Sequence, residues 1–330
     1  MSRTDYSRPA PSDPGAAGPA PATRSFAIPA AYAGRRLDQA LAELCPEHSR
    51  SRLKQWIEAG DVRVDGAPAE PRRKLRGGEQ VALTAVPAAP LDDAPEDIPL
   101  AILHEDDALL VLDKPAGLVV HPGSGNRAGT LLNALLHHVP SLAALPRAGI
   151  VHRLDKDTSG LLVVAKTAAA QQSLVRALAA HSVVREYLAV AHGAIDRATT
   201  IDAPIGRHPT HRTTMAVVAS GKPARTHVTP IESFGIATLV RCRLETGRTH
   251  QIRVHLAAIG HPLLGDPAYG TRRSRGGVLA FDRQALHATR LTFKHPSTGR
   301  DLRVDAPPPA DFATLVDTLR EHAHADDADD

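Results

Sequence analysis

Residues 149–165 read Gly-Ile-Val-His-Arg-Leu-Asp-Lys-Asp-Thr-Ser-Gly-Leu-Leu-Val-Val-Ala, and this stretch indicates the fold most directly. Its last five residues, 161–165, form an uninterrupted apolar run that predicts a buried strand. The residues before that strand combine two carboxylates with three basic side chains: Asp155, Asp157, His152, Arg153 and Lys156. Loops at the ends of buried elements commonly present reactive groups, so we take residues 149–160 as the candidate site.

The sequence on both sides of this stretch alternates between strand and helix patterns. Buried-strand patterns occur at 108–112 and 118–120, on either side of a turn at 113–117. Further patterns predict helices near 130–138 and 168–180, and strands near 184–191, 215–218, 226–231 and 236–244. Such interleaving predicts an α+β domain built on a mixed, largely antiparallel sheet flanked by helices.

The N-terminal part of the chain predicts a smaller domain of its own. Leucines at 37, 41 and 44 predict one helix, and a second helix is expected from Arg50 to Ala59, with Gly60 ending it. Alternating Val62 and Val64 then lead into an Asp-Gly hairpin turn. Composition divides the whole chain into a disordered tail at 1–24, this small domain at 25–84, a linker at 85–100, the α+β domain at 101–319 and an acidic tail at 320–330.

The charge of the chain favours a polyanionic partner. The net charge is +3, but residues 92–107 and 321–330 together hold twelve acidic residues and no Lys or Arg, so the remainder is markedly basic. Ten aromatic residues are too few for the stacking platforms of multi-aromatic RNA-binding folds. Two cysteines exclude a disulfide framework, and no apolar run has the length of a membrane span. We therefore expect a soluble cytoplasmic protein, most simply a monomer.

Three separated motifs resemble those of the RNA pseudouridine synthases of the ribosomal-large-subunit type. They are HRLDKDTSG at 152–160, VVREYLAV at 183–190 and ETGRTHQIRVHL at 245–256. The resemblance implies that Asp155 is the catalytic carboxylate and that Arg253 pairs with it. It also implies that Tyr187 stacks on the target uracil and takes part in the final proton removal. Arg153 matches the arginine that fills the place of a flipped nucleotide, and flipping is required because a stacked base hides its reactive atoms.

The implied reaction breaks the N1–C1′ bond of uridine, rotates the uracil, joins C5 to C1′ and removes the C5 proton. Uracil keeps its own electrons throughout, so we expect neither a cofactor nor a metal. Asp155 acts either as a nucleophile or as a base for a proton on the sugar, and the sequence leaves both routes open. Residues 252, 256 and 259 predict an amphipathic helix that carries Arg253 beside its buried stripe. There the guanidinium needs an anionic partner and would hold the Asp155 carboxyl ionised.

The small N-terminal domain resembles S4-type RNA-binding domains, through residues 36–38, 51–57 and 60–66. This resemblance implies RNA contacts by Arg50, Arg52 and Lys54, although the same residues could simply form a solvated helix face. Residues 208–217 resemble a further segment of the family and add Arg212 to the expected RNA contacts. In that segment His211 replaces an expected lysine.

The expected substrate is a loop of large-subunit ribosomal RNA, where single-stranded bases can be splayed out. Two alternatives remain. One is a tRNA-directed pseudouridine synthase, and the other is a non-catalytic RNA-binding or ribosome-assembly factor. The S4-like domain disfavours the first, and the complete set of Asp155, Tyr187 and Arg253 disfavours the second.

Overall fold

The computed structural model describes residues 22–45, 48, 50–85, 94–122, 126, 128–211, 213–270 and 280–328. The chain forms two compact units, divided between Pro90 and Leu91. In the described part of the chain, no helix is both long enough and apolar enough to cross a bilayer.

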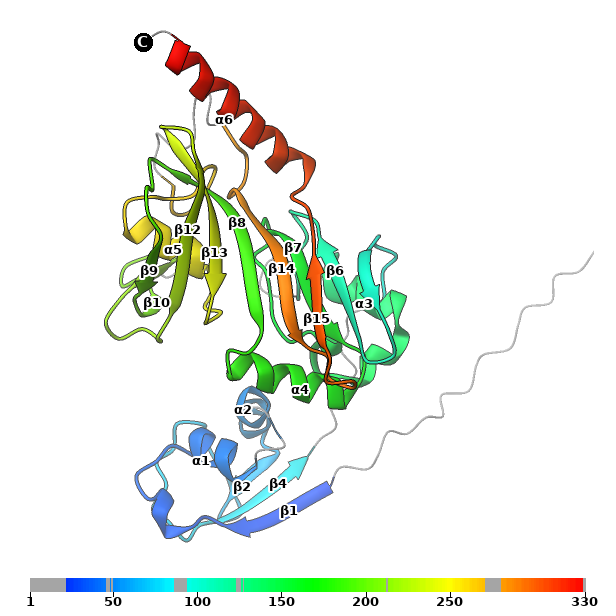
Figure 1. The fold of residues 1–330 in the computed structure, drawn as a ribbon. Coiled ribbons are helices and arrows are strands. Elements are labelled where there is room, and N and C mark those ends of the chain that lie inside the picture. The colour runs from blue at the N-terminus through cyan, green and yellow to red at the C-terminus, as the bar shows by residue number, and fades with distance from the viewer. Residues whose placement is uncertain are drawn as a thin grey trace, which may run out of the picture. The chain divides into compact units, whose positions relative to one another are not determined.

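The first unit combines a small antiparallel sheet with two α-helices (Figure 1). Its strands lie in the order β1 (Ala22–Ala27), β4 (Gln80–Ala85), β2 (Val62–Val64) and β3 (Ala67–Pro68). The 3-10 turn η1 (Ala30–Tyr32) precedes helices α1 (Leu37–Leu44) and α2 (Arg50–Ala59). The two predicted helices are therefore confirmed. Leucines and valines from both helices and from β2 and β4 form one buried cluster, so this unit has a core of its own.

The second unit is built on a nine-stranded sheet. The strands lie in the order β5 (Ala101–Glu105), β6 (Leu109–Lys114), β7 (Ser159–Ala165), β14 (Leu286–Lys294), β8 (Val184–His192), β13 (Ala237–Leu244), β12 (Arg225–Ser233) and β9 (Thr199–Asp202), with β15 (Asp301–Asp305) paired to β14. Only β7 and β14 pair in parallel, and all other neighbours in the sheet are antiparallel. The predicted mixed, largely antiparallel sheet is confirmed.

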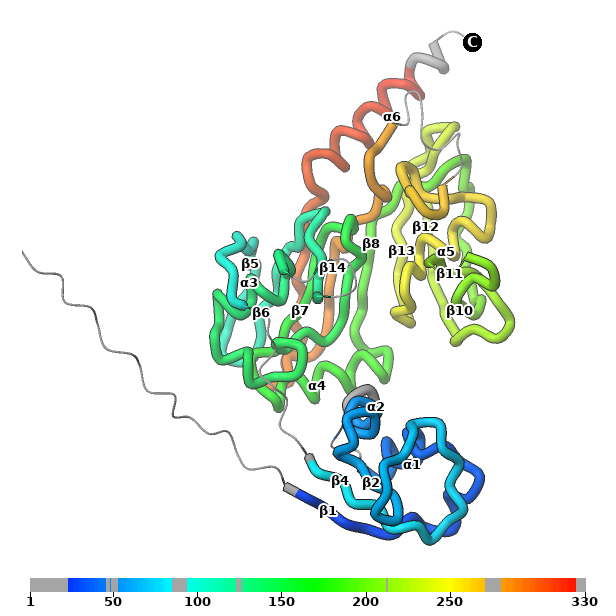
Figure 2. Tube along the Cα trace, turned by 180° about the vertical axis from the view of Figure 1, so that it is seen from behind, coloured from blue at the N-terminus to red at the C-terminus, as the bar shows by residue number. Residues whose placement is uncertain are grey.

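Helices flank this sheet and close its core. Apolar residues of α3 (Leu131–His138), α4 (Ala168–Ala179) and α5 (Gln251–Ala258) join the strands in the largest buried cluster. Short 3-10 turns, η2 (Pro140–Ala144) and η3 (Pro146–Gly149), connect α3 to the loop before β7. Seen from behind, α5 and the hairpin of β10 (Ile205–Arg207) and β11 (Met215–Val217) lie over the β12–β13 part of the sheet (Figure 2).

The strand expected at 118–120 is wrong. Val119 makes a single bridge to Thr130, and no strand forms there. The physical reason is that the carbonyls of Val119 and Val120 accept the N–H groups of Leu131 and Leu132. These are the first N–H groups of α3, which lack partners inside the helix. The apolar run therefore satisfies a helix start and adds nothing to the sheet.

The segments next to the expected tails and linker are more ordered than their composition indicates. β1 begins at Ala22, inside the expected tail of 1–24, and α6 (Ala310–Ala328) continues into the expected acidic tail. Phe312 and Leu319 of α6 are buried against the sheet in a separate apolar cluster, which anchors the helix. Within the expected linker, the carbonyl of Ala94 accepts the Asn133 side-chain amide, so this part packs on α3. Residues 86–93 lie outside the described residues.

Candidate active site

A cavity of about 930 Å³ opens in the second unit, between the loop before β7, strand β8 and the segment that joins β13 to α5. Its volume lies in the range of small-ligand and cofactor sites, about 300–1,000 Å³. Four residues expected from the sequence line it, namely Asp155, Tyr187, Arg253 and Arg153. Asp155 and Arg253 are 98 positions apart in the chain, so the fold assembles this site from distant segments.

A buried lysine fixes the loop that carries Asp155. Lys114, at the end of β6, is fully buried, and its Nζ donates to the carbonyls of Pro115 at 2.7 Å and of Leu118 and Lys156 at 2.9 Å. These three contacts use all the donors of an ammonium group. Burial lowers the pKa of Lys114 to about 8. Because Lys156 follows Asp155 directly, this clamp sets the backbone beside the candidate carboxylate.

The glycine that ends the HRLDKDTSG motif is required by a close approach of two strands. Gly160 lies where β7 meets β14 in parallel, and its φ is 111°. A Cβ at this position would stand 2.3 Å from the carbonyl oxygen of Ala288. Any side chain would push the two strands apart, and with them the start of β7 that follows the loop.

The central contact of the site joins Asp155, Arg253 and Asp266. Arg253 donates from Nη1 to Asp155 Oδ2 over 3.0 Å. The rest of the guanidinium grips Asp266, from Nε to Oδ2 at 2.7 Å and from Nη2 to Oδ1 at 2.8 Å. Asp266 is fully buried, whereas the Asp155 side chain keeps 16% of its surface exposed. The Asp155 carboxylate is therefore accessible from the cavity, whereas Arg253 is held in place by the buried Asp266.

Electrostatics keep Arg253 and Asp266 in their charged forms. Burial alone would lower the pKa of Arg253, but the hydrogen bonds and charges of Asp266 and Asp155 raise it overall. Burial alone would likewise raise the pKa of Asp266, but its bonds to Arg253 lower it. Asp266 Oδ1 also accepts the backbone N–H groups of Ala268 and Tyr269. A carboxylate with this many donors stays ionised and neutralises Arg253 permanently.

His250 approaches the other oxygen of Asp155. Its Nε2 lies 3.8 Å from Asp155 Oδ1, and its Nδ1 lies 2.7 Å from Tyr269 Oη. The Tyr269 oxygen accepts the N–H of Met215 at 2.9 Å, so the tyrosine proton is free to point at His250 Nδ1. With Nδ1 as acceptor, the neutral ring carries its proton on Nε2, facing Asp155. Burial lowers the pKa of His250 and favours this neutral form.

Strand β8 presents Tyr187 to the cavity. Side chains alternate along the strand, so Arg185 and Tyr187 point to the cavity side and Glu186 to the other. Tyr187 is 6% exposed, and burial raises its pKa, which keeps its hydroxyl protonated in the free protein. The ring therefore offers an apolar face and a hydroxyl group beside Asp155.

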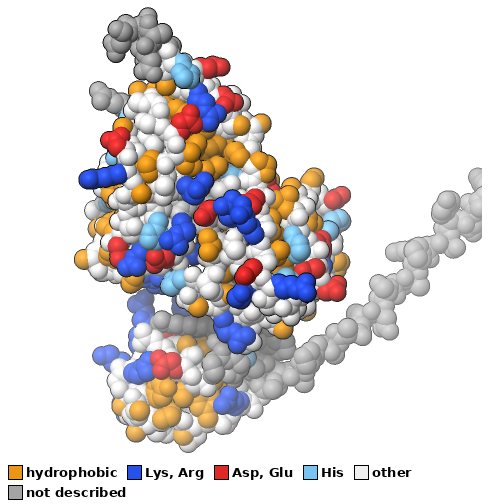
Figure 3. All heavy atoms as spheres, in the orientation of Figure 1, with side chains coloured by type: hydrophobic (Ala, Val, Ile, Leu, Met, Phe, Trp, Pro, Cys, Tyr) orange, Lys and Arg blue, Asp and Glu red, His pale blue; other side chains and the backbone are white. Residues whose placement is uncertain are grey.

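The expected RNA-binding residues are only partly described. Arg153 is exposed at the cavity lining, and the Lys54 side chain is 54% exposed and lies 3.4 Å from Glu58. The side chains of Arg50 and Arg52, and the whole of Arg212, lie outside the described residues. On the face seen in Figure 3, basic and acidic side chains are intermixed over the second unit.

A cluster of two histidines and a carboxylate lies away from the cavity, between the β5–β6 and β14–β15 turns. His104 Nε2 and His295 Nε2 lie 3.1 and 2.8 Å from Asp106 Oδ2. His295 Nδ1 accepts the N–H groups of Ser297 and Thr298, so the proton of the neutral ring sits on Nε2. The Nε2–H group then donates a hydrogen bond to Asp106 Oδ2. The hydrogen bonds of this cluster join the two turns, and this arrangement fits a structural role better than a metal site.

The sequence missed several residues of this site. Lys114 and Asp266 occur in Asp-Lys-Pro and Gly-Asp-Pro, two sequences that predict turns and indicate no further role. Their burial and partners follow only from the tertiary structure. His250 and Arg185 lie inside two of the three motifs, but the motifs indicate no specific role for either residue. The strand position of Arg185, two residues from Tyr187 on the same face, was the available signal.

Comparison with known proteins relates both units to characterised families. A sequence model described as RNA pseudouridylate synthase matches residues 108–258, and one for the S4 domain matches residues 35–81. The chain is similar to curated proteins called ribosomal large subunit pseudouridine synthase D. The Nitrosomonas europaea protein is 54% identical, over 92% of this chain and 90% of its own length. The Escherichia coli K12 protein is 52% identical, over 90% of this chain and 94% of its own length.

A solved structure agrees with these sequence relatives. Human RNA Pseudouridylate Synthase Domain Containing 1 superposes with a TM-score of 0.53 at 29% identity, covering 69% of this chain and 97% of the human chain. The cavity, the Asp155–Arg253–Asp266 contacts and the Lys114 contacts thus occur on a fold shared with that protein.

Proposed function

This chain belongs to the RNA pseudouridylate synthase family and isomerises uridine to pseudouridine in RNA, and we propose that its substrate is large-subunit ribosomal RNA. The proposal is supported by relatives that carry this substrate in their names and share most of the chain's length. It is also supported by the match of the first unit to the S4 domain, since S4-type domains bind RNA. All the proposed catalytic groups line one cavity of a single chain, which supports a monomer as the active form.

We propose that Asp155 is the catalytic carboxylate, and the carrying observation is its asymmetric hydrogen bonding. Oδ2 accepts a hydrogen bond from Arg253. Oδ1 accepts none from the described residues, and the Nε2 of His250 lies 3.8 Å from it. A carboxylate fixed through one oxygen keeps the other available for the sugar of a bound nucleotide. Either route, attack on C1′ or removal of a sugar proton, needs this anionic and reachable oxygen.

Arg253 is proposed to hold and orient Asp155 through the anchor on Asp266. Tyr187 is proposed to lie against the uracil, with its ring as a stacking surface and its hydroxyl near the moving base. Tyr187 is protonated in the free protein, so any part in removing the C5 proton requires that its own proton first move elsewhere. Arg153, exposed at the lining, is proposed to fill the gap that the flipped nucleotide leaves in the RNA.

The test compares Asp155→Asn with Asp157→Asn, a matched change two residues along the same loop. Each variant is assayed for tritium release from large-subunit RNA labelled at uridine C5, and for RNA affinity. We expect Asp155→Asn to lose isomerisation and keep affinity, because the change removes charge and keeps shape. Asp157 is outside the cavity lining, so its variant should retain turnover. Tritium release by Asp155→Asn at more than a trace of the unmodified rate contradicts the assignment.

The substrate is tested separately by mapping pseudouridines in cells that lack the gene. Loss of pseudouridine in large-subunit RNA supports the proposal. Loss confined to tRNA contradicts it and favours the tRNA-directed alternative.

A further inference from the structure

Arg185 is a buried cation with almost no partner. Its side chain is 6% exposed and lines the same cavity as Asp155 and Tyr187. Of its five donors, Nη2 reaches the carbonyl of Glu245 at 3.2 Å, and the buried Nε has no hydrogen-bond partner among the described residues. A guanidinium withdrawn from water is strongly unfavourable unless an anion or several acceptors replace the water.

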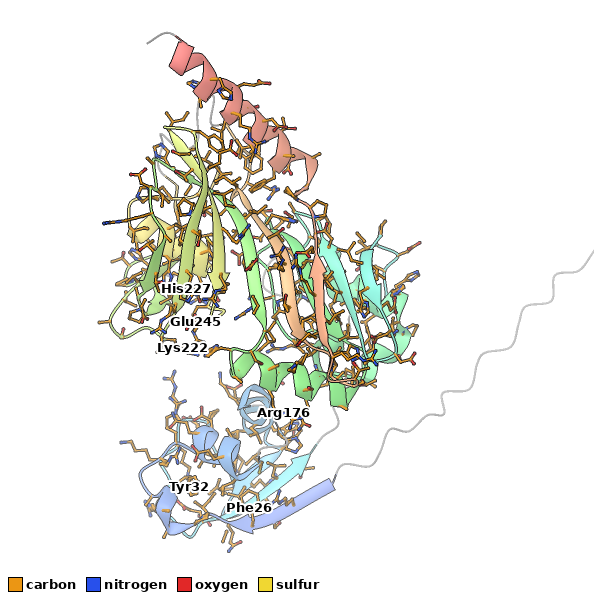
Figure 4. The ribbon with its side chains drawn as sticks, viewed as in Figure 1. Phe26, Tyr32, Arg176, Lys222, His227 and Glu245 are labelled. Atoms are coloured by element: carbon orange, nitrogen blue, oxygen red, sulfur yellow. The ribbon has the colours of Figure 1, made fainter. Side chains whose placement is uncertain are left out.

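The acidic side chains around Arg185 are already paired elsewhere. Glu245 gives Arg185 only its carbonyl, because its carboxylate binds His227 Nε2 at 2.7 Å and Arg225 Nη1 at 3.3 Å. Figure 4 shows His227 and Glu245 side by side at the ends of β12 and β13. Glu186 points to the opposite face of the sheet and pairs with Arg290. The described part of the chain therefore supplies no ion pair to Arg185.

A glycine lets the chain pass close to the Arg185 guanidinium. Gly247 lies in the turn after β13, and a Cβ there would stand 2.6 Å from Arg185 Nη1. The neighbouring His152 cannot share the charge. Burial and then the positive charge of Arg185 lower the pKa of His152 to about 3, and its Nε2 accepts the Val163 N–H at 3.1 Å. Arg185 thus stays without an ion pair among the described residues, on the same face of β8 as Tyr187.

We propose that Arg185 binds a backbone phosphate of the RNA next to the target uridine, and so supplies an anion site inside the catalytic cavity. A planar guanidinium with free donors matches a phosphate oxygen pair. The phosphate would supply the negative charge that the protein does not place beside Arg185. Burial destabilises the unpaired guanidinium in the free enzyme, but it strengthens the contact between guanidinium and phosphate in the complex. This inference rests on the proposed function, since it takes the bound molecule to be the RNA substrate.

The test uses the full-length protein with Arg185→Gln, Arg185→Lys and the control Arg300→Gln. Arg300 is exposed on the β14–β15 turn and outside the cavity lining, so its variant removes an equal charge elsewhere. For Arg185→Gln we expect RNA affinity to fall about tenfold or more. The slope of log affinity against log salt should become shallower by about 0.7–0.9, as for one lost phosphate contact. Turnover at saturating RNA should change much less, and Arg185→Lys should keep part of the affinity as a point charge.

Thermal unfolding of the free variants separates binding from a structural role. If Arg185 waits for a ligand, Arg185→Gln removes an unpaired buried charge and should leave the midpoint unchanged or raise it. A lowered midpoint with unchanged RNA affinity overturns the proposal and makes Arg185 a structural residue. Unchanged affinity with reduced turnover also overturns it, because the guanidinium then acts on the base during the reaction. Failure of the unmodified protein to release tritium from large-subunit RNA would instead count against the proposed function.

Discussion

Asp266 binds Arg253 behind the proposed catalytic carboxylate, and it is the most consequential residue that the sequence did not reveal. The variant Asp266→Asn tests its role. The substitution keeps the shape of the side chain but replaces one acceptor oxygen with an amide that also donates. One arm of the two-pronged contact with Arg253, 2.7 or 2.8 Å long, then becomes a contact between two donors. Arg253 would then be a buried cation whose remaining ion pair is the one with Asp155.

The expected loss of stability follows from burial. Breaking a buried ion pair by removing one partner costs about 3–5 kcal/mol. Asp155 remains as a second anion and asparagine keeps one acceptor, so we expect the free energy of unfolding to fall by about 2–4 kcal/mol. Turnover should fall about a hundredfold, because a displacement of about 1 Å at a reacting group has effects of that order. RNA affinity should change little, since Asp266 is fully buried and cannot touch RNA.

Asp311→Asn is the matched control. Asp311 makes the same two-pronged contact with Arg283, at 2.7 and 3.0 Å, but its side chain is 49% exposed. Arg283 is itself buried, but it also donates to the carbonyls of Asp157, Gln284 and Leu286, and half of the Asp311 side chain is in water. We therefore expect Asp311→Asn to lower the free energy of unfolding clearly less than Asp266→Asn does. The double variant Arg253→Met with Asp266→Leu should recover part of the stability without recovering turnover, because the fully buried pair is removed as a whole while Asp155 loses its partner. An Asp266→Asn protein with the denaturation midpoint and tritium release of the unmodified enzyme would refute the reasoning.

Four further outcomes can be checked. Lys114→Met should lower the free energy of unfolding by about 1–3 kcal/mol in denaturant titration, because three carbonyls lose their donor; unchanged stability and turnover would show that the clamp is dispensable. Tyr187→Phe should retain more tritium release than Tyr187→Leu, since only the first keeps a ring to stack, and equal losses contradict the stacking role. His152 resists protonation when folded, with a pKa near 3 against an ordinary 6.5, so the unfolded chain binds the extra proton between these values. Stability should therefore fall with acidification in that window by up to about 1.4 kcal/mol per pH unit, and His152→Gln should flatten the dependence. The fragment 91–330 should fold and bind ribosomal RNA with a shallower salt dependence, by about 0.7–0.9 per lost phosphate contact; an unchanged slope would give the first unit another role.

Local patterns were enough to predict most elements of both units. The α4 helix and strands β8 and β13 follow from runs of apolar residues whose period matches their structure. The expected strand at 118–120 failed because an apolar run does not say where its hydrogen bonds go. Its carbonyls were taken by the start of α3, a partner that periodicity cannot identify.

The candidate site divides in the same way. Asp155, Tyr187 and Arg253 could be named from motifs, because each lies in a stretch whose residue order is distinctive. Asp266 could not, since its importance depends on meeting Arg253 inside the fold. Arg185 was visible as a basic residue, but a sequence does not show whether a cation is paired. That state depends on where Glu245 directs its carboxylate.

The charges of the cavity form a pattern that fits a nucleotide and its reaction. Asp266 neutralises Arg253, so the triad as a whole presents one negative charge, on Asp155. Arg185 presents one positive charge on the same face of the sheet as Tyr187. When the N1–C1′ bond of uridine breaks, positive charge develops at C1′ while the phosphates remain negative. An anionic carboxylate at the sugar and a guanidinium at the phosphate would place each charge beside its opposite. Pairing Arg185 inside the protein would stabilise the free enzyme and remove one of these two contacts.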